Sequence, residues 1–338
     1  MKKWLVSALP ALVACKASPA QHEPDAQTAD AAPDAGADFC SDTDPRAPAV
    51  TIAATPEAGE QPYIDALTTA QNKIRVEIYE MGYGGILDQL TAKAQAGVTV
   101  QIIFDTSEKM VNQKYFDALS AAGAQCAWSS PQFTYQHAKF FVVDDQVAVL
   151  STGNFSKNYS ILLERNFVAT DHDPADITDL QNLFDADWNG APPAMDCTRM
   201  VISPINARSR VLDLIDSATT TLTIESMQFA DTQVRQHVAA RVQAGVQVRA
   251  MLADAGWITA NADAATYLKN LGVPVKYIPH LHTKVLVADG TRAYMGSENF
   301  SFTSLDKNRE VGVVVTEASS IEPLTTTFEK DWAAGTSF

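Results

Sequence analysis

The sequence lacks an apolar run long enough to cross a bilayer, and it lacks an excess of basic residues. The run from Trp4 to Ala14 is far shorter than the roughly 20 residues that a membrane-spanning helix needs. Lys and Arg total 25 against 40 Asp and Glu, a net charge of −15. Because Lys and Arg supply most of the affinity for a nucleic-acid backbone, this balance disfavours long, nonspecific nucleic-acid binding. Cysteine is also scarce, with four residues, so at most two disulfides can form.

The N-terminal segment reads as a leader followed by a tether. Two lysines precede the short apolar run, and the sequence LVAC, which ends at Cys15, resembles a bacterial lipobox. We therefore expect residues 1–15 to be a signal peptide and Cys15 to carry a lipid that anchors the chain to a membrane. Cleavage after Ala20, giving a secreted protein, is the alternative. Residues 16–47 are rich in Ala, Pro, Asp and Gln, the composition of a disordered acidic tether. The folded part is expected to be exported, as a periplasm-facing or outer-membrane lipoprotein of the cell envelope.

One arrangement of residues occurs twice in the chain. Each copy has a histidine, a lysine two residues later, an aspartate five residues after the lysine, and an asparagine ten residues after the aspartate. The first copy comprises His137, Lys139, Asp144 and Asn154, and the second comprises His282, Lys284, Asp289 and Asn299. A given histidine has about one chance in a few hundred of carrying both nearer partners by accident, so two such copies indicate a function.

The chemistry of these residues suits a phosphodiester. The stretches FFVV and VLVA after the lysines predict buried strands, so each histidine and lysine project from the same side. A lysine provides a positive charge for a phosphate oxygen, while an imidazole can act as nucleophile or proton donor near neutral pH. Two such strands facing each other would surround one phosphodiester. One histidine could then attack phosphorus while the other protonates the leaving oxygen.

The doubled motif resembles the phospholipase D superfamily, whose members carry paired HxKxxxxD motifs, usually followed by GSxN and a glutamate. The resemblance covers the chain from about residue 48 to its C-terminus. It implies a phosphodiesterase that needs no metal or other cofactor and works through a covalent phosphohistidine. The lysines and asparagines of both copies would bind the phosphate. In the first half, Ser151 replaces the usual glycine.

The downstream glutamate distinguishes the two halves. Glu310, in KNREVGVVV, matches it in the second half. The first half, LLERNFVAT, offers Glu164, Arg165 or Asn166 in this place. A carboxylate favours the protonated form of an imidazole, so we expect Glu310 to lie beside His282 and make it the general acid. His137 would then be the nucleophile, unless Glu164 orients it in the same way.

Other residues of the motifs have two interpretations. Asp144 and Asp289 could act in catalysis, but they fall at strand ends, where aspartate often caps a turn. His280, two residues before His282, suggests a metal site, yet the lysine of each motif would repel a cation, so no metal is expected. Four aromatic residues could line an acyl or base pocket or pack in the ordinary way. They are Trp128, Phe133, Tyr135 and Trp257.

The duplication extends beyond the motifs. AQAGVTVQIIFD matches VQAGVQVRAMLAD, and LFDADW matches TFEKDW, at a steady offset near 145 residues. Each unit reads as strands alternating with helices and ends in a helix that closes on Asp-Trp. We therefore predict an α/β fold of two pseudo-symmetric layered lobes, residues 48–190 and 191–338, with the active site at their interface. Cys40 and Cys197 precede the first elements of their halves and could pair, whereas Cys126 is expected to be a buried free thiol.

The motif does not name the substrate. A lipid anchor and an acidic surface favour a membrane phospholipid, hydrolysed to phosphatidic acid and a head-group alcohol. An exported nuclease, with nucleic acid as its substrate, is the alternative, and an inactive phosphate-binding module is a third hypothesis. Because one chain supplies both motifs, we expect a monomer.

Overall fold

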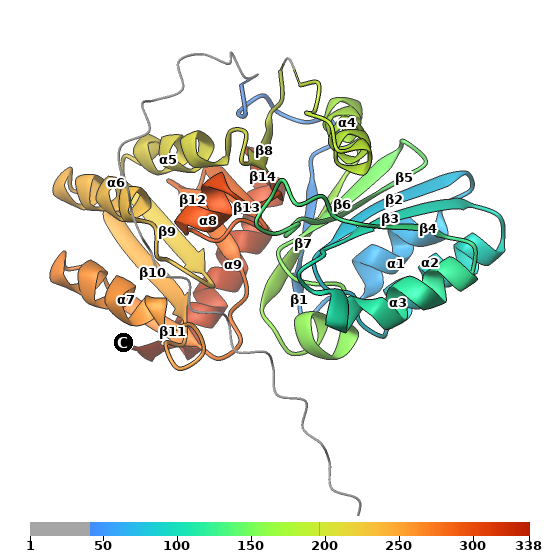
Figure 1. Ribbon diagram of the computed structural model, residues 1–338. Helices are drawn as coiled ribbons and strands as arrows, with labels where there is room; N and C mark the ends of the chain where they lie inside the picture. Colours follow the sequence, from blue (N-terminus) through green and yellow to red (C-terminus); the bar gives the residue numbers. More distant parts are fainter. Residues whose placement is uncertain (1–40, 196) are drawn as a thin grey trace, which may run out of the picture. The chain divides into compact units, whose positions relative to one another are not determined.

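The computed structural model describes residues 41–195 and 197–338, which belong to one compact unit covering residues 31–338 (Figure 1). The predicted signal peptide, the lipid site Cys15 and nearly all of the predicted tether lie outside the described residues. Among the helices that the structure describes, none combines the length and apolar character that a membrane span requires.

The first lobe contains a seven-stranded mixed sheet in the order β1-β7-β6-β5-β2-β3-β4. Strands β2, β3 and β4 pair in parallel, and all other neighbours are antiparallel. The strands are β1 (Thr51–Thr55), β2 (Lys73–Ile78), β3 (Thr99–Phe104), β4 (Gln125–Trp128), β5 (Lys139–Val143), β6 (Val147–Ser151) and β7 (Asn166–Asp171). The helices are α1 (Gln61–Thr68), α2 (Gly85–Gln95), α3 (Lys109–Ala121), the π-helical η1 (Lys157–Ile161) and α4 (Pro174–Asn189).

The second lobe repeats this order, with the sheet β15-β11-β10-β9-β12-β13-β14-β8. Its strands are β8 (Met200–Ser203), β9 (Thr221–Ser226), β10 (Gln247–Ala253), β11 (Val275–Ile278), β12 (Lys284–Ala288), β13 (Arg292–Gly296), β14 (Glu310–Val315) and β15 (Thr336–Ser337). Its helices are α5 (Ala207–Ser217), α6 (Thr232–Gln243), α7 (Ala260–Asn270), α8 (Phe302–Asp306) and α9 (Ala318–Ala334). Apart from β15, each element has a counterpart in the first lobe, which confirms the predicted pseudo-symmetric α/β pair.

Local sequence explains where α4 ends the first lobe. Asp173 is its N-cap and accepts hydrogen bonds from the backbone N–H groups of Ala175 and Asp176. Pro174 fills the first helical position, where its missing N–H costs nothing. Gly190 follows the last turn at φ +64°, a conformation that glycine adopts without strain. The next element, β8, begins at Met200 and pairs with β14, so it already belongs to the sheet of the second lobe.

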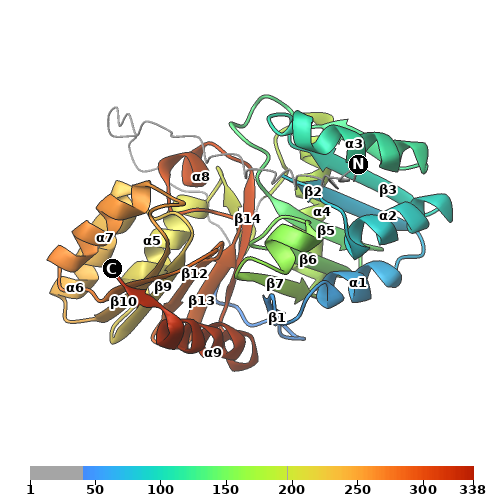
Figure 2. The ribbon, with the colours of Figure 1, turned by 90° about the horizontal axis from the view of Figure 1, so that it is seen from below.

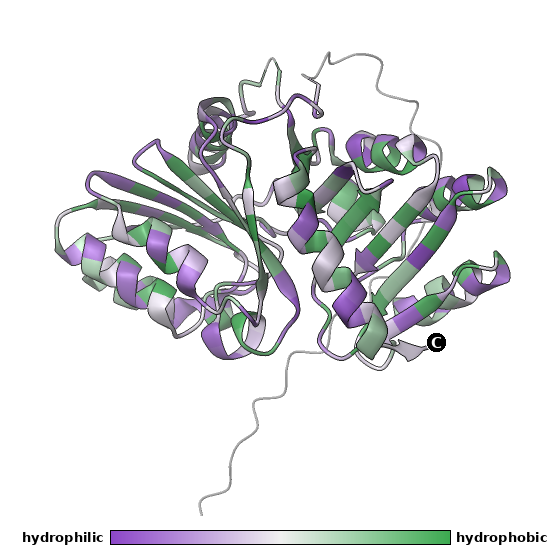
Figure 3. Cartoon of the chain, turned by 180° about the vertical axis from the view of Figure 1, so that it is seen from behind, coloured by the Kyte–Doolittle hydropathy of each residue, from purple (hydrophilic) through white to green (hydrophobic). Residues whose placement is uncertain are grey.

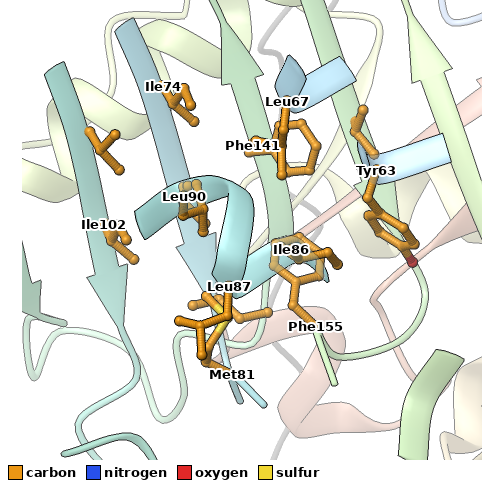
Figure 4. Close-up of a cluster of buried hydrophobic side chains, with 14 of the residues drawn as sticks. Tyr63, Leu67, Ile74, Met81, Ile86, Leu87, Leu90, Ile102, Phe141 and Phe155 are labelled. Carbon is orange, nitrogen blue, oxygen red and sulfur yellow. The ribbon is translucent and has the colours of Figure 1, made fainter. Parts of the chain in front are cut away.

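Each lobe has its own core on the outer face of its sheet. In the first lobe, helices α1 and α2 pack onto the sheet through Leu67, Leu87 and Leu90, opposite Ile74 and Phe141 (Figure 4). The second lobe has an equivalent cluster. Figure 3 shows the hydrophobic residues concentrated in the strands, whereas the helices alternate hydrophobic and hydrophilic residues. Such alternation is expected for helices that cover one face of a sheet.

A third buried cluster joins the two lobes. It combines residues of α4 and the first sheet, such as Leu180 and Phe140, with residues of α9 and the second sheet, such as Leu324 and Val287. Strand β14 lies at this boundary, between the remaining strands of the two lobes (Figure 2). A continuous apolar interface of this kind disfavours independent motion of the lobes.

Two pseudo-symmetric ion pairs cross the interface. Arg309 of the second lobe donates to both carboxylate oxygens of Asp187 on α4, at 2.7 and 3.0 Å. Arg165 of the first lobe donates in the same way to Asp331 on α9, at 2.6 and 3.0 Å. Each arginine and each aspartate is offset from its counterpart by 144 residues. The aspartates come from the repeated Asp-Trp sequence, so that repeat marks the interface between the lobes.

The segment just before the first lobe is packed against the protein. Arg46 is buried and contacts Asp176, while its side chain also donates to the carbonyl of Val314 at 2.7 Å. Asp42 is buried beside Arg292. The prediction that the tether runs to residue 47 is therefore wrong for these residues, because a buried arginine and aspartate gain ion partners on the folded part.

Cys197 is disulfide-bonded and Cys126 is free, while Cys40 lies outside the described residues.

The crossing ion pairs yield a test of stability. Asp187→Asn should lower the free energy of unfolding by about 3–5 kcal/mol, because it leaves the buried Arg309 without its counter-charge. Glu329→Gln, which removes the partner of Arg249 in an exposed pair, is the control and should cost about 0–1 kcal/mol. Denaturant unfolding measures both. Equal costs for the two variants would show that the lobes do not depend on this pair.

Candidate active site

The two motif strands carry their histidines and lysines to one place. Lys139 and Lys284 are the first residues of β5 and β12, and each motif histidine lies two residues earlier. Both lysines are buried, and the side chains of His137 and His282 are 13 % and 7 % exposed. The first motif is therefore slightly more accessible than the second.

Backbone hydrogen bonds hold each histidine against the opposite lobe. The N–H of His137 donates to the carbonyl of Arg309 at 2.9 Å, and the N–H of His282 donates to the carbonyl of Arg165 at 3.0 Å. The same two arginines make the crossing ion pairs. Each one therefore fixes both the interface and the histidine backbone of the other lobe.

Glu310 contacts the histidine of the other half. Its Oε2 lies 2.6 Å from Nδ1 of His137, so the expectation that Glu310 lies beside His282 was wrong. The reason is topological: Arg309, the residue just before β14, forms a bridge to Gln136 of the first lobe, so Glu310 at the start of β14 lies next to His137. Burial alone would raise the pKa of Glu310, but the charge and hydrogen bond of His137, together with Lys139 and Asn308, lower it to about 2. The carboxylate is ionised, and His137 therefore carries its proton on Nδ1.

His282 has a different partner. Its Nδ1 lies 3.0 Å from Oδ1 of Asn166, the first residue of β7, which holds the place of Glu310 in the first lobe. Glu164 is more distant, at 3.4 Å. Burial lowers the pKa of His282 well below the ordinary value, and the charges of Lys284, Lys139 and His137 lower it further. The pKa of His137 is also lowered by burial, but Glu310 opposes that change.

The two lysines form a buried cationic pair. Lys284 donates to the carbonyl of Thr152 in the other lobe at 3.1 Å and to that of His282 at 2.9 Å. Lys139 donates to the carbonyl of His137. Burial lowers the pKa of Lys139 to about 7, and Lys284 contributes to that decrease. Burial likewise lowers the pKa of Lys284 to about 8. Desolvated positive charges of this kind are ready to bind an anion.

The motif asparagines lie near the same place. Asn154 donates through Nδ2 to Glu80 at 3.2 Å, and the backbone N–H of Asn299 donates to Ser304 at 2.9 Å. Within the described residues, the buried Oδ1 atom of each asparagine has no hydrogen-bond partner. Each can accept a hydrogen bond from a water or a substrate hydroxyl. Their predicted contact with the phosphate stays a prediction.

The motif aspartates lie at the far ends of their strands. Asp144, at φ +50°, begins the turn between β5 and β6, and its carboxylate accepts from the backbone N–H groups of residues 71–73 at 2.6–2.8 Å. Asp289, at φ +54°, does the same for residues 219–221. Positive φ suits aspartate at the start of such hairpin turns. These contacts correct the catalytic interpretation, because they occupy both carboxylates with backbone away from the histidines.

Sequence reasoning missed several residues of the site. Ser304 and Asn308 both donate to Oε1 of Glu310 and so hold the carboxylate against His137. Tyr79 packs edge-on against the ring of His137, with ring centroids 4.7 Å apart. Glu80 is partly buried near them, and burial, aided by the charge of Glu108, raises its pKa to about 7. Tyr79 and Glu80 directly follow β2. Their position at the end of a strand is the sequence feature that could have identified them.

The four candidate aromatic residues separate into two groups. Trp128 stacks on Phe116 and packs against the core, and the guanidinium of Arg309 lies 4.2 Å from the ring of Phe133. Trp257 lies 6.2 Å from the ring of His282, and Tyr135 packs against Tyr79. Trp257 and Tyr135 therefore border the site.

Ser151, which replaces the glycine usual in the motif, forms a hydrogen bond with Tyr63 at 2.8 Å.

Comparison with known proteins agrees with this architecture. The family model described as "Cardiolipin synthase, PLD-like domain" matches residues 63–188 and 211–332, once in each lobe. The chain therefore belongs to the phospholipase D superfamily. The fold resembles that of phosphatidylserine synthase from Haemophilus influenzae, with a TM-score of 0.70 at 11 % identity, covering 87 % of this chain and 88 % of the other.

Two curated relatives are similar in sequence. Cardiolipin synthase from Clostridium perfringens is 25 % identical over 327 residues, which cover 79 % of this chain and 67 % of that protein. Mitochondrial cardiolipin hydrolase from Danio rerio is 26 % identical over 130 residues, which cover 37 % of this chain and 57 % of that protein. The chain thus spans about two thirds of the bacterial relative.

The lysine pair yields a test with a simple anion. Sulfate keeps its charge between pH 6 and 9, whereas both lysines of the empty protein lose their protons over that range. Sulfate should therefore raise the melting temperature more at pH 6 than at pH 9. Without anion, the free energy of unfolding should rise with pH from about 7 to 10, because the unfolded chain then binds more protons.

Differential scanning fluorimetry of Lys139→Met is the matched measurement. This variant should lose most of the pH dependence of the sulfate effect, whereas Lys307→Met, at an exposed lysine, should keep it. A sulfate effect that is equal at both pH values in the unsubstituted protein would contradict the anion site.

Proposed function

We propose that the protein hydrolyses a phospholipid to phosphatidic acid and a head-group alcohol, with His137 as the nucleophile. The observation that carries this proposal is the paired site. Two histidines and two lysines from separate lobes meet there, and one histidine is oriented by an ionised carboxylate. A phosphodiester needs positive charge around its oxygens, a nucleophile on one side and a proton donor on the other.

In the first step, Nε2 of His137 attacks phosphorus, and the bond from phosphorus to the head-group oxygen breaks. Glu310 holds the Nδ1 proton of His137, so the lone pair on Nε2 is free. The same carboxylate stabilises the positive charge that the ring acquires once it is phosphorylated. His282 protonates the departing oxygen. Its pKa is low in the empty site, and the negative phosphodiester raises it by offsetting the charges of the two lysines.

In the second step, His282 accepts a proton from a water molecule, and the water oxygen attacks phosphorus. The bond between phosphorus and Nε2 of His137 breaks, and phosphatidic acid leaves. The unpartnered amide oxygens of Asn154 and Asn299 can accept hydrogen bonds from that water. An alcohol in place of the water would give transfer rather than hydrolysis.

Three arguments support a phospholipid as the substrate. Both curated relatives described above have names that refer to cardiolipin, a phospholipid. The acidic charge of −15 disfavours polyanions such as nucleic acids. An N-terminal lipid on Cys15, which we also propose, would keep the site near a bilayer at the cell envelope. Nucleic acid remains a necessary control substrate.

Turnover assays with EDTA present test the proposed activity. Residues 31–338 should release head group from phosphatidylcholine and cardiolipin vesicles, and His137→Ala and His282→Ala should each lower that rate by at least about a thousandfold. Single- and double-stranded DNA are assayed in parallel. Cleavage of DNA with inert vesicles would transfer the same site to a nuclease.

Trapping of the intermediate tests the two roles. With a substrate whose leaving group departs without protonation, such as phosphatidyl-p-nitrophenol, His282→Ala still allows the first step but removes the group that activates water, so phosphatidyl-His137 should accumulate and be detected by mass spectrometry of the denatured protein. His137→Ala should form no adduct. An adduct on His282 in the unsubstituted enzyme would reverse the roles.

A further inference from the structure

Exposed apolar side chains gather on segments that lead away from the active site. Among the described residues, eight large hydrophobic side chains are exposed, and six of them lie in three segments of the first lobe. We call these six the rim surface. They are Tyr83, Met110, Val111, Tyr159, Leu162 and Leu163. Large exposed apolar groups that cluster in this way mark an interaction site.

Each of the three segments is connected to residues of the site. Tyr83 follows Tyr79 and Glu80, which directly follow β2. The segment that contains η1 runs from Asn154 to Asn166, so Tyr159 and its apolar neighbours lie in a loop with site residues at both ends. Met110 and Val111 begin α3, shortly after Glu108, which accepts a hydrogen bond from Tyr79 at 2.9 Å.

Hydrogen bonds also join these segments to one another. Asn112 of α3 accepts from the backbone N–H of Met81 at 3.0 Å and donates to the carbonyl of Tyr79 at 2.7 Å. The N–H of Gly82 donates to Phe155 at 2.8 Å, and that of Lys157 donates to Tyr83 at 3.3 Å. These hydrogen bonds hold the three segments that carry the rim surface next to one another at the edge of the site.

Lysines accompany the apolar residues. The ammonium of Lys114 lies 5.0 Å from the ring of Tyr83, and that of Lys109 lies 5.2 Å from the ring of Trp128. Lys157, the first residue of η1, pairs with Glu60 at 3.2 Å. Exposed lysines therefore lie on the same segments as the exposed tyrosine, leucine and methionine side chains. Such a mixture suits the boundary between lipid head groups and acyl chains.

The second lobe has a related feature. Phe302, at the start of α8, is exposed, and Lys307 lies 5.6 Å from its ring. The segment runs from Asn299 to Glu310, just as the η1 segment runs from Asn154 to Asn166. Both lobes thus present an apolar residue on the chain between two residues of the site.

We propose that the rim surface docks onto a phospholipid bilayer and holds the opening of the active site against the head groups. This inference rests on the proposed phospholipid substrate and extends it, because it assigns a membrane-contacting surface to the folded part, separate from any N-terminal lipid. Continuity with the site and the apolar and cationic composition favour a bilayer as the occupant. The apolar side chains enter the lipid, and the lysines face the phosphates.

Vesicle flotation of residues 31–338 tests this surface without the predicted lipid. This part contains all of the hydrophobic clusters described above. Met110→Ser, at a side chain that is 98 % exposed, changes the rim surface with no core contact to lose. A Leu162→Ser/Leu163→Ser variant removes two further apolar groups. Both should bind vesicles of phosphatidylcholine and phosphatidylglycerol at least roughly tenfold more weakly, since each lost apolar side chain removes buried contact with lipid.

Phe338→Ser is the matched control, because Phe338 is exposed but lies at the C-terminus, where Lys269 covers its ring. It should bind vesicles like the unsubstituted protein. Turnover of a short-chain phosphatidylcholine below its micellar concentration should be unchanged in the rim variants, while turnover on vesicles falls with binding. Loss of turnover on both substrates would contradict docking.

The outcomes separate this proposal from the proposed function. Equal vesicle binding by the rim variants and the control would overturn docking even if phospholipid is hydrolysed. Rim variants that lose vesicle binding, in a protein that turns over no phospholipid, would support docking and overturn the proposed reaction. Sedimentation velocity is run in parallel. A dimer that dissociates in the rim variants, with no change in vesicle binding, would assign the surface to a second copy of the chain.

Discussion

Everything in this site depends on the exchange of contacts between the lobes. Arg165 and Arg309 each make a buried ion pair with the closing helix of the other lobe and accept a backbone hydrogen bond from the other lobe's motif histidine. The orienting groups are exchanged as well, since Glu310 contacts His137 and Asn166 contacts His282. Neither lobe contains a complete histidine site, so the duplicated halves have to stay together for either motif to be ordered.

Within that symmetric frame, the residues that contact the Nδ1 atoms of the two histidines differ in charge. Glu310 and Asn166 occupy equivalent places at the starts of β14 and β7, but only Glu310 is charged. A carboxylate at Nδ1 makes the opposite ring nitrogen a better nucleophile and supports the cation formed on phosphorylation, whereas an amide fixes the orientation of the ring without that charge. In the proposed mechanism, this single position gives the two copies of the motif different chemical roles.

The sequence predicted the two lobes, the pairs of histidine and lysine and the repeat, because each leaves a periodic or repeated pattern. It did not predict which lobe Glu310 would serve. The spacing from His282 to Glu310 is local, but contact depends on β14 bridging to the first lobe, which no local pattern encodes. For the same reason the sequence predicted the Asp-Trp repeat only as the end of each unit's last helix, although Asp187 and Asp331 are ion partners across the interface.

The two buried lysines favour the binding of an anion between the lobes. Lys139 and Lys284 have pKa values of about 7 and 8, so near neutral pH the fold holds charge that burial disfavours. Asp144 and Asp289 hold in place the hairpins that carry the lysines. Glu310 supplies one negative charge that partly offsets the lysine charges. An incoming phosphodiester adds the negative charge that the pair lacks. In the proposed mechanism, substrate binding and the protonation of His282 are coupled, because an anion that offsets the charges of the lysines also raises the pKa of His282.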